Sequence, residues 1–183
     1  MSHRGVQSGT LLGLDEDTIR RGLLAFCGAD RRQKIYNVGD ITVIDDCYNA
    51  SPESMRAALD VLASVAASKG KRAAALLGDM LELGEYSRLM HDQVGQYAAQ
   101  MKVNQLFCYG MMADVVAEAA IKNGIRAENV FVCLDTKNPA AMAEMISSAL
   151  QPGDVLLVKA SRGVAAENVI ECLREYYGRK QKK

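Results

Sequence analysis

The segment DDCYNASP, which begins at Asp45, carries the most informative group of side chains in the sequence. Asp45 and Asp46 supply adjacent carboxylates, and Tyr48 and Asn49 add a phenol and an amide. Side chains of these kinds can hold a ribose, a phosphate or a carboxylate group. The same residues also suit an ordinary turn, in which Ser51 caps a helix and the acidic residues favour its positive end. The spacing alone leaves both interpretations open.

Polar segments also follow the other apolar runs, at the places where strands are expected to end. In open α/β sheets, ligands gather outside the carboxyl ends of the strands, so a site is expected in these segments. Four of the five segments carry side chains that can hold phosphate, ribose or carboxylate, and the exception is Gly110-Met111-Met112. The other four begin at Asp45, Gly78, Asp135 and Lys159.

Short apolar runs alternate with amphipathic helical patterns along most of the sequence. The runs at 73–77, 105–109, 130–133 and 155–158 each precede a helical pattern. Continuous apolar strands that alternate with helices indicate a parallel sheet, covered on both faces and joined by right-handed crossovers. The sequence therefore predicts an α/β fold with a doubly wound, mostly parallel Rossmann-like sheet and helices on both faces.

The beginning of the chain departs from this alternation. Asp15 as N-cap predicts a first helix that ends near Cys27-Gly28, and two strands at 34–38 and 41–44 surround a turn at Gly39. Further helices are predicted from Ser51-Pro52 to Ala66, from about Ser87, at 112–123, at 139–150 and up to Gly178.

Composition argues against several classes of protein. Lysine plus arginine balances aspartate plus glutamate at 22 each, so no global positive field attracts nucleic acid. No apolar run approaches the ~18 residues that a membrane span needs. The 5 cysteines are scattered without a C-x-x-C pair, which favours small buried hydrophobes in a reducing compartment over metal ligands. We therefore expect a cytoplasmic protein with no metal site, no nucleic-acid partner and no membrane partner.

Two phosphate-binding motifs are absent from the sequence. Gly70-Lys71 is followed by Arg72 and does not belong to a G-x-x-x-x-G-K-[ST] loop, and no G-x-G-x-x-G follows any expected strand. The Rossmann-like pattern therefore does not indicate dinucleotide binding, and no phosphate cradle is expected within this chain.

Ordered segments of the chain resemble motifs of the Mur ligase family. DDCYNASP resembles the D-D-x-Y-N-A-N-P motif of the C-terminal domain in the Mur ligases that add D-alanyl-D-alanine to UDP-N-acetylmuramoyl-tripeptide. Ser51 stands where that motif has its second asparagine. The other matching segments are Arg32-Gln33 at the domain entrance, Gly78–Gly84 (G-D-M-x-E-L-G), His91, and Lys159–Gly163 in the V-K-G-S-R element.

The resemblance implies that the whole enzyme is an ATP-dependent peptide ligase. Such an enzyme phosphorylates a peptide carboxylate with ATP, using Mg, and the amine of D-alanyl-D-alanine then attacks the acyl phosphate. The implied partners are UDP-N-acetylmuramoyl-tripeptide, D-alanyl-D-alanine, ATP and the N-terminal and central domains of the same enzyme. This domain would act as a closing lid. Alone we expect it to be inactive and to bind no cofactor tightly, because the phosphate loop belongs to the central domain.

The resemblance also divides the chain. We expect residues 1–13 to be a tag or disordered leader and residues 14–30 to be a linker helix from the central domain. We expect residues 31–178 to form the Mur ligase C-terminal domain and residues 179–183 to be a disordered basic tail.

Two groups of site residues are implied by the matching positions. The nucleotide-binding group is Arg32, Asp46, Tyr48, Asn49 and Ser51. The dipeptide-binding group is Lys159, Ser161, Arg162, Asp79 and Glu82, with Arg162 suited to the terminal carboxylate because a guanidinium forms two parallel hydrogen bonds with it. No catalytic residue is assigned, and His91 is more typical of a hydrogen-bonded structural residue than of a general base.

Structural alternatives stand beside these roles: a surface charge for Arg32, a core aromatic for Tyr48, and a helix cap for Ser161. Two other functions also stay open. The chain could be a stand-alone module that binds a nucleotide or a dipeptide. It could also be a flavodoxin-like or receiver-like signalling domain, in which Asp45 or Asp46 accepts a phosphoryl group.

Overall fold

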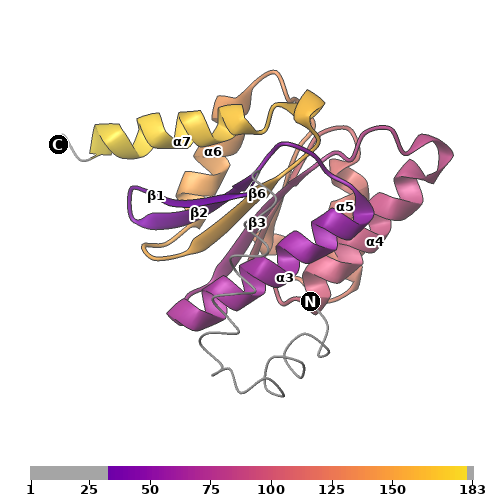
Figure 1. Ribbon diagram of the computed structural model, residues 1–183, viewed down its shortest axis with the longest axis horizontal. Coiled ribbons are helices and arrows are strands. Elements are labelled where there is room, and N and C mark those ends of the chain that lie inside the picture. The colour runs from indigo at the N-terminus through magenta and orange to yellow at the C-terminus, as the bar shows by residue number, and fades with distance from the viewer. Residues whose placement is uncertain (1–32, 181–183) are drawn as a thin grey trace, which may run out of the picture.

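Six strands form one sheet within residues 33–180, the part of the chain that this computed structural model describes (Figure 1). The order across the sheet is β1-β2-β6-β3-β4-β5. The strands are β1 (Lys34–Val38), β2 (Ile41–Asp46), β3 (Ala73–Gly78), β4 (Gln105–Tyr109), β5 (Val130–Cys133) and β6 (Val155–Lys159). All neighbouring strands run parallel except β1 and β2, which are antiparallel. The predicted mostly parallel sheet is confirmed.

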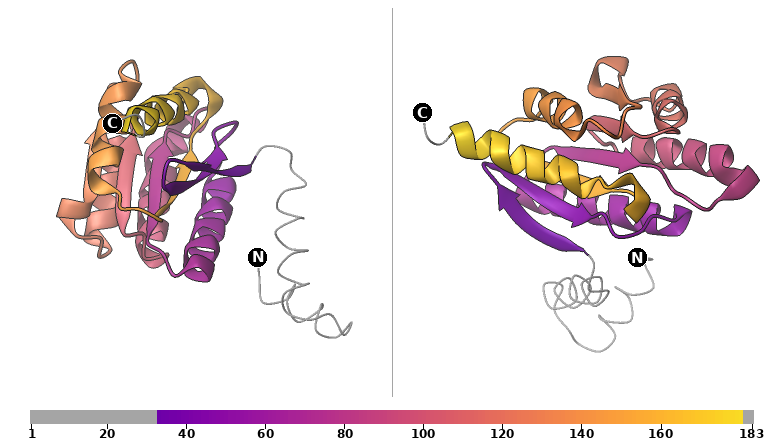
Figure 2. Two further views of the ribbon diagram at one scale, coloured as in Figure 1. Left: turned by 90° about the vertical axis from the view of Figure 1, so that its left-hand side faces the viewer. Right: turned by 90° about the horizontal axis from the view of Figure 1, so that it is seen from above.

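Helices cover both faces of this sheet (Figure 2). The helices are α3 (Pro52–Lys69), α4 (Ser87–Gln100), α5 (Ala113–Lys122), α6 (Pro139–Ala149) and α7 (Glu167–Lys180). Strand β3 is buried along its whole length and points alternate side chains to opposite faces. Ala75 and Leu77 pack in the cluster with α3, α4 and α5, whereas Ala74 and Leu76 pack with α6 and α7. Burial on both faces explains why a central strand such as β3 is a continuous apolar run.

Local sequence signals fix the ends of the clearest helix, α3. The Ser51 hydroxyl accepts a hydrogen bond from Ser54 N, and the Ser54 hydroxyl accepts one from Ser51 N, which together form a capping box. Pro52 occupies the first turn, and Gly70 ends the helix with φ of 60°. These contacts fix where the chain leaves the segment that follows β2.

The hairpin of β1 and β2 turns at Gly39, which has φ of 59°. A side chain there would also collide with α7, because a Cβ atom would lie 2.5 Å from the ring of Tyr177. The hairpin places the start of β1 next to the end of β2, with Lys34 opposite Asp45. The described chain therefore begins at the carboxyl edge, the edge at which the five parallel strands end.

Two element ends differ from the prediction. Strand β2 continues to Asp46 rather than ending at Ile44, because Asp45 and Asp46 pair in register with Val158 and Lys159. Helix α7 continues through Gly178 to Lys180, so the predicted end at Gly178 is wrong. An ion pair one turn apart, from Arg179 to Glu175 at 3.1 Å, spans this last turn. The predicted leader, the first helix and the last three residues lie outside the described residues.

None of the helices within residues 33–180 is long and apolar enough to cross a membrane.

Candidate functional site

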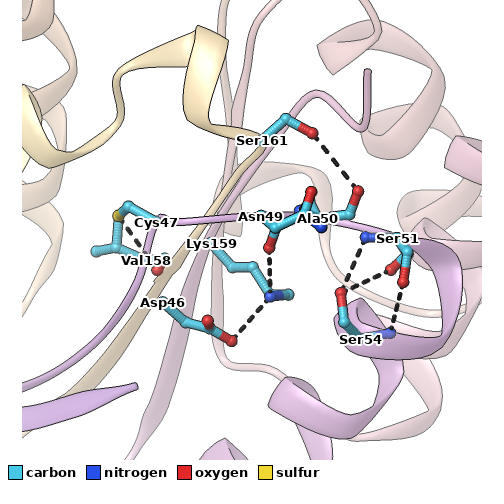
Figure 3. Close-up of polar contacts among 9 residues, drawn as sticks. All are labelled: Asp46, Cys47, Asn49, Ala50, Ser51, Ser54, Val158, Lys159 and Ser161. Atoms are coloured by element: carbon cyan, nitrogen blue, oxygen red, sulfur yellow. Dashed lines mark hydrogen bonds and ion pairs between the residues drawn. The ribbon is translucent and has the colours of Figure 1, made fainter. Parts of the chain in front are cut away.

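Lys159, the last residue of β6, lies at the centre of the carboxyl edge (Figure 3). Its Nζ donates to Asp46 Oδ2 at 2.8 Å and to the Asn49 carbonyl oxygen at 2.8 Å. The residue is only 1% exposed, so its ammonium group is stabilised by these partners rather than by water. The pair joins the end of β6 to the end of β2 and determines the course of the segment that follows.

That segment exposes two side chains directly after the buried pair. Tyr48 is 49% exposed and Asn49 is also exposed, with its Oδ1 accepting a hydrogen bond from Ala50 N at 2.8 Å. The Arg162 guanidinium lies over the Tyr48 ring, 5.7 Å from its centroid, and Arg162 is itself exposed. The residues after β2 and the residues after β6 thus present an aromatic ring, an amide and a guanidinium at one edge.

Asp79, directly after β3, is buried and fully engaged by the protein. Its Oδ2 accepts from Met111 N at 2.7 Å, and its Oδ1 accepts from Met112 N at 2.9 Å. Gly110, with φ of 120°, makes this approach possible, because a Cβ atom there would lie 2.5 Å from Asp79 Oδ2. The carboxylate therefore joins the end of β3 to the start of α5, where a negative charge is favoured.

Ser161 joins the segment after β6 to the segment after β3. Its hydroxyl accepts from Leu81 N at 2.9 Å, and its backbone N–H donates to the Asp79 carbonyl at 3.0 Å. The Leu81 side chain also lies against Gly163, where a Cβ atom would come within 2.8 Å of it. Arg162 is thus carried by a backbone segment that is fixed on both sides.

His91, on α4, is 1% exposed and supports the segment after β3. Its Nε2 lies 2.9 Å from Met80 N, and its Nδ1 lies 2.7 Å from the Ser87 carbonyl oxygen. Because a backbone N–H can only donate and a carbonyl can only accept, the ring carries its proton on Nδ1. His91 makes no contact with the exposed side chains of the edge that would suit a general base.

The predicted site residues that the structure describes fall into three groups. Tyr48, Asn49 and Arg162 meet at the carboxyl edge with exposed side chains. Five others, namely Asp46, Ser51, Asp79, Lys159 and Ser161, lie at the same edge but use their side chains on internal partners. Glu82 is exposed in a left-handed backbone conformation with φ of 66°. Arg32 lies outside the described residues, two positions before the start of β1 at Lys34.

Sequence reasoning missed the contribution of the Gly110-Met111-Met112 segment. It has no polar side chain, yet two of its backbone N–H groups bind Asp79. The available signal was the glycine directly before an expected helix, which is typical of a close backbone approach.

Burial raises the pKa of two side chains beside the site, Tyr36 and Cys47. Burial, followed by the charge of Asp45, raises the pKa of Tyr36 to about 12, and the Tyr36 hydroxyl donates to Asp45 Oδ2 at 3.0 Å. The same two causes raise the pKa of the Cys47 thiol well above its usual range, so the thiol is protonated at neutral pH and unsuited to nucleophilic chemistry.

No candidate metal cluster accompanies these residues in the described structure. Within residues 33–180, no group of three or more His, Cys, Asp or Glu side chains could hold a metal ion. A polar hollow is lined by Arg72, Lys102, Asn104 and Gln105, but it lies at the amino edge, where the parallel strands begin.

Comparisons with known proteins identify relatives of this chain. The UDP-N-acetylmuramoyl-tripeptide--D-alanyl-D-alanine ligase of Bacillus subtilis is 29% identical over 171 residues, which cover 93% of this chain and 36% of that protein. The protein of the same name from Mycobacterium leprae is 37% identical over 147 residues, which cover 73% and 28% of the two chains. The chain thus spans about a third of the length of these relatives.

Solved structures share the fold. MurF from Acinetobacter baumannii superimposes with a TM-score of 0.66 at 25% identity, over 92% of this chain and 35% of that one. The MurF ligase from Thermotoga maritima, solved in complex with ADP, gives a TM-score of 0.65 at 24% identity, over 81% and 31%. The family model described as Mur ligase, glutamate ligase domain, matches residues 30–162, which is most of the sequence. With the motifs of the carboxyl edge inside that range, the chain belongs to the Mur ligase family and comprises its glutamate ligase domain.

Proposed function

We propose that this chain is the C-terminal domain of an ATP-dependent ligase that adds D-alanyl-D-alanine to UDP-N-acetylmuramoyl-tripeptide in the cytoplasm. The observation that carries the proposal is the exposure of Tyr48, Asn49 and Arg162 at one edge, directly after the buried Lys159–Asp46 pair. The names of the relatives supply the reaction, and the edge supplies groups of the right chemistry.

The proposal divides the site residues by whether their side chains can reach a ligand. Arg162 binds the carboxylate of the dipeptide, for which a guanidinium is the best-matched cation. Tyr48 and Asn49 contact the nucleotide together with Arg32. Lys159, Asp46, Asp79 and Ser161 act by positioning these groups, because their polar atoms already bind within the domain. Glu82, which is exposed, is available to the ammonium group of the dipeptide.

The described residues fit part of a nucleotide site and do not fit a magnesium site. Tyr48 and Asn49 offer a ring and an amide to a base or ribose, which is consistent with ATP as the nucleotide. Asp46 and Asp79 already have a cationic partner and two N–H partners respectively, so neither carboxylate is available as a metal ligand. Magnesium and the phosphate loop are therefore assigned to other parts of the longer enzyme, and this domain alone is inactive.

The test is steady-state kinetics of the full-length ligase that contains this domain. Arg162→Ala should raise the KM for D-alanyl-D-alanine by about 10- to 100-fold, the equivalent of one charge-assisted hydrogen-bonded pair, with a smaller change in the KM for ATP. Arg126→Ala is the matched control, because Arg126 is an exposed arginine near the opposite edge. An unchanged dipeptide KM in Arg162→Ala would contradict the assignment.

Calorimetry of the 183-residue chain separates a lid from an independent binding module. A domain that completes its site only with its neighbours should bind ATP weakly or not at all. Tight binding of ATP by the chain alone would favour the stand-alone module instead.

A further inference from the structure

The segment from Gly78 to Gly84, between β3 and α4, contacts three other parts of the carboxyl edge. Asp79 binds the start of α5, and Leu81 N donates to the Ser161 hydroxyl after β6. Met80 N donates to His91 on α4. The Met80 and Leu81 side chains carry no hydrogen-bond donor, so these two residues donate through their backbone N–H groups. The positions of those groups therefore determine where its neighbours lie.

His91 is the one of these partners that comes from a helix interior. Its Nε2 accepts the Met80 hydrogen bond inside a site with 1% exposure, so water cannot replace it. The Ser87 carbonyl, 2.7 Å from Nδ1, orients the ring and keeps Nε2 free of a proton. The nearest carboxylate oxygen, Asp79 Oδ1, is 4.0 Å from Nε2 and already accepts from Met112 N. The geometry gives the ring a single acceptor role.

The next residue along the segment transmits this position to Arg162. Met80 and Leu81 are adjacent, and Leu81 N donates to the Ser161 hydroxyl while its side chain lies against Gly163. Ser161 and Gly163 flank Arg162 on both sides. A displacement of Met80 would therefore change the course of the backbone that carries the guanidinium.

We propose that His91 is a positioning residue for Arg162, acting through the Met80–Leu81 backbone and Ser161. The role of Arg162 toward the dipeptide rests on the function proposed above, whereas the positioning itself does not. His91 touches no substrate in this scheme. It holds the segment after β3 so that the guanidinium stays at the carboxyl edge.

Hydrogen exchange on this chain tests the positioning without any assay of activity. In His91→Gln, the side-chain oxygen can replace Nε2 as an acceptor, whereas His91→Leu has similar bulk and no acceptor. We expect the Leu81 amide to exchange about tenfold faster in His91→Leu, relative to the Leu157 amide in the core of β6, and near the wild-type ratio in His91→Gln. Val94→Ala, a buried change on the same helix that removes no hydrogen-bond acceptor, should leave the ratio unchanged.

Two outcomes would overturn the positioning role. One is a Leu81-to-Leu157 exchange ratio that stays at the wild-type value in His91→Leu. The other is an equal rise in His91→Leu and His91→Gln, which would mean that ring packing matters and the acceptor does not.

Kinetics of the full-length ligase then connect the positioning to dipeptide binding. His91→Leu should raise the KM for D-alanyl-D-alanine about tenfold with little change in the KM for ATP, and His91→Gln should restore it. A loss of kcat alone would contradict the role, since it would indicate only a smaller folded fraction. If the wild-type enzyme has no such ligase activity, the proposed function fails while the exchange result still decides the positioning.

Discussion

At each edge of the sheet a cationic side chain binds a carboxylate, and the two pairs have different surroundings. At the amino edge, Arg72 binds Asp154 through two hydrogen bonds of 3.0 Å and 2.6 Å, and Asp154 also accepts from Gln151 N. At the carboxyl edge, Lys159 binds Asp46 and a carbonyl oxygen. The Arg72 pair stabilises the turn between α6 and β6. The Lys159 pair is followed by a segment with an exposed ring and an exposed amide.

The difference indicates what each pair contributes. The same ionic chemistry contributes to stability at both edges, but at the carboxyl edge it also fixes the position of the groups that we propose to bind a ligand. We therefore expect a substitution of Lys159 to affect both stability and ligand binding. A substitution of Arg72 should affect stability alone, and a substitution of Arg162 should affect ligand binding alone.

The largest effect is expected for Lys159→Met, which should affect both. Removing the ammonium leaves the Asp46 carboxylate beside an apolar side chain, and breaking a buried pair in this way typically costs about 3 to 5 kcal/mol. The free energy of unfolding, measured by urea titration, should fall by that amount. Lys159→Met with Asp46→Leu is the matched control, since removing both charges should recover much of the loss.

Arg72→Met should lower stability by less, about 1 to 3 kcal/mol. Asp154 is 3% exposed at its side chain and would lose its charged partner, but the Arg72 side chain is 32% exposed and Gln151 N still donates to the carboxylate. The KM values of the full-length enzyme should not change. A rise in the dipeptide KM in this variant would mean that the amino edge also affects dipeptide binding, which would contradict the difference between the two edges.

A smaller effect is expected at high pH from Tyr36. Its hydroxyl ionises near pH 10 in an unfolded chain and near 12 in the folded protein, so its contribution to stability is complete below pH 10 and is lost as the pH rises toward 12. Tyr36→Phe should reduce the fall in the urea midpoint between pH 9 and about pH 11.5. An identical fall in both proteins would mean that other groups, such as Tyr177, account for it.

The smallest effect on stability is expected for Arg162→Ala. The side chain is exposed and its contact with the Tyr48 ring is partly solvated, so the urea midpoint should correspond to a change within about 0.5 kcal/mol. With the rise in dipeptide KM predicted above, this variant would affect binding without affecting stability. A large loss of stability would show that Arg162 belongs to the packing of the edge.

The alternation of apolar runs and helical stripes was sufficient to predict the sheet. Runs such as Ala73–Leu77 are apolar at every position because both faces are covered, and the capping signals at Ser51 and Pro52 are local. The sequence could not show that β2 extends to Asp46, because that extension depends on pairing with Lys159, more than a hundred residues away.

The edge at which the candidate residues gather was predictable, but the contacts of each side chain were not. The motifs gave Asp79 and Lys159 as polar residues after strands, and parallel strands bring such residues to one edge. Whether a carboxylate meets a ligand or two backbone N–H groups depends on contacts between distant segments. The Asp79 contacts come from Met111 and Met112, whose side chains gave no polar signal.

The antiparallel direction of β1 determines where the preceding part of the chain is attached to this domain. Because Lys34 lies opposite Asp45, the polypeptide joins this domain beside the proposed ligand-binding surface and not at the far end of the sheet. A change in the backbone φ and ψ angles just ahead of β1 would therefore swing Tyr48, Asn49 and Arg162 together through a short arc. Opening and closing would require no rearrangement of the interior.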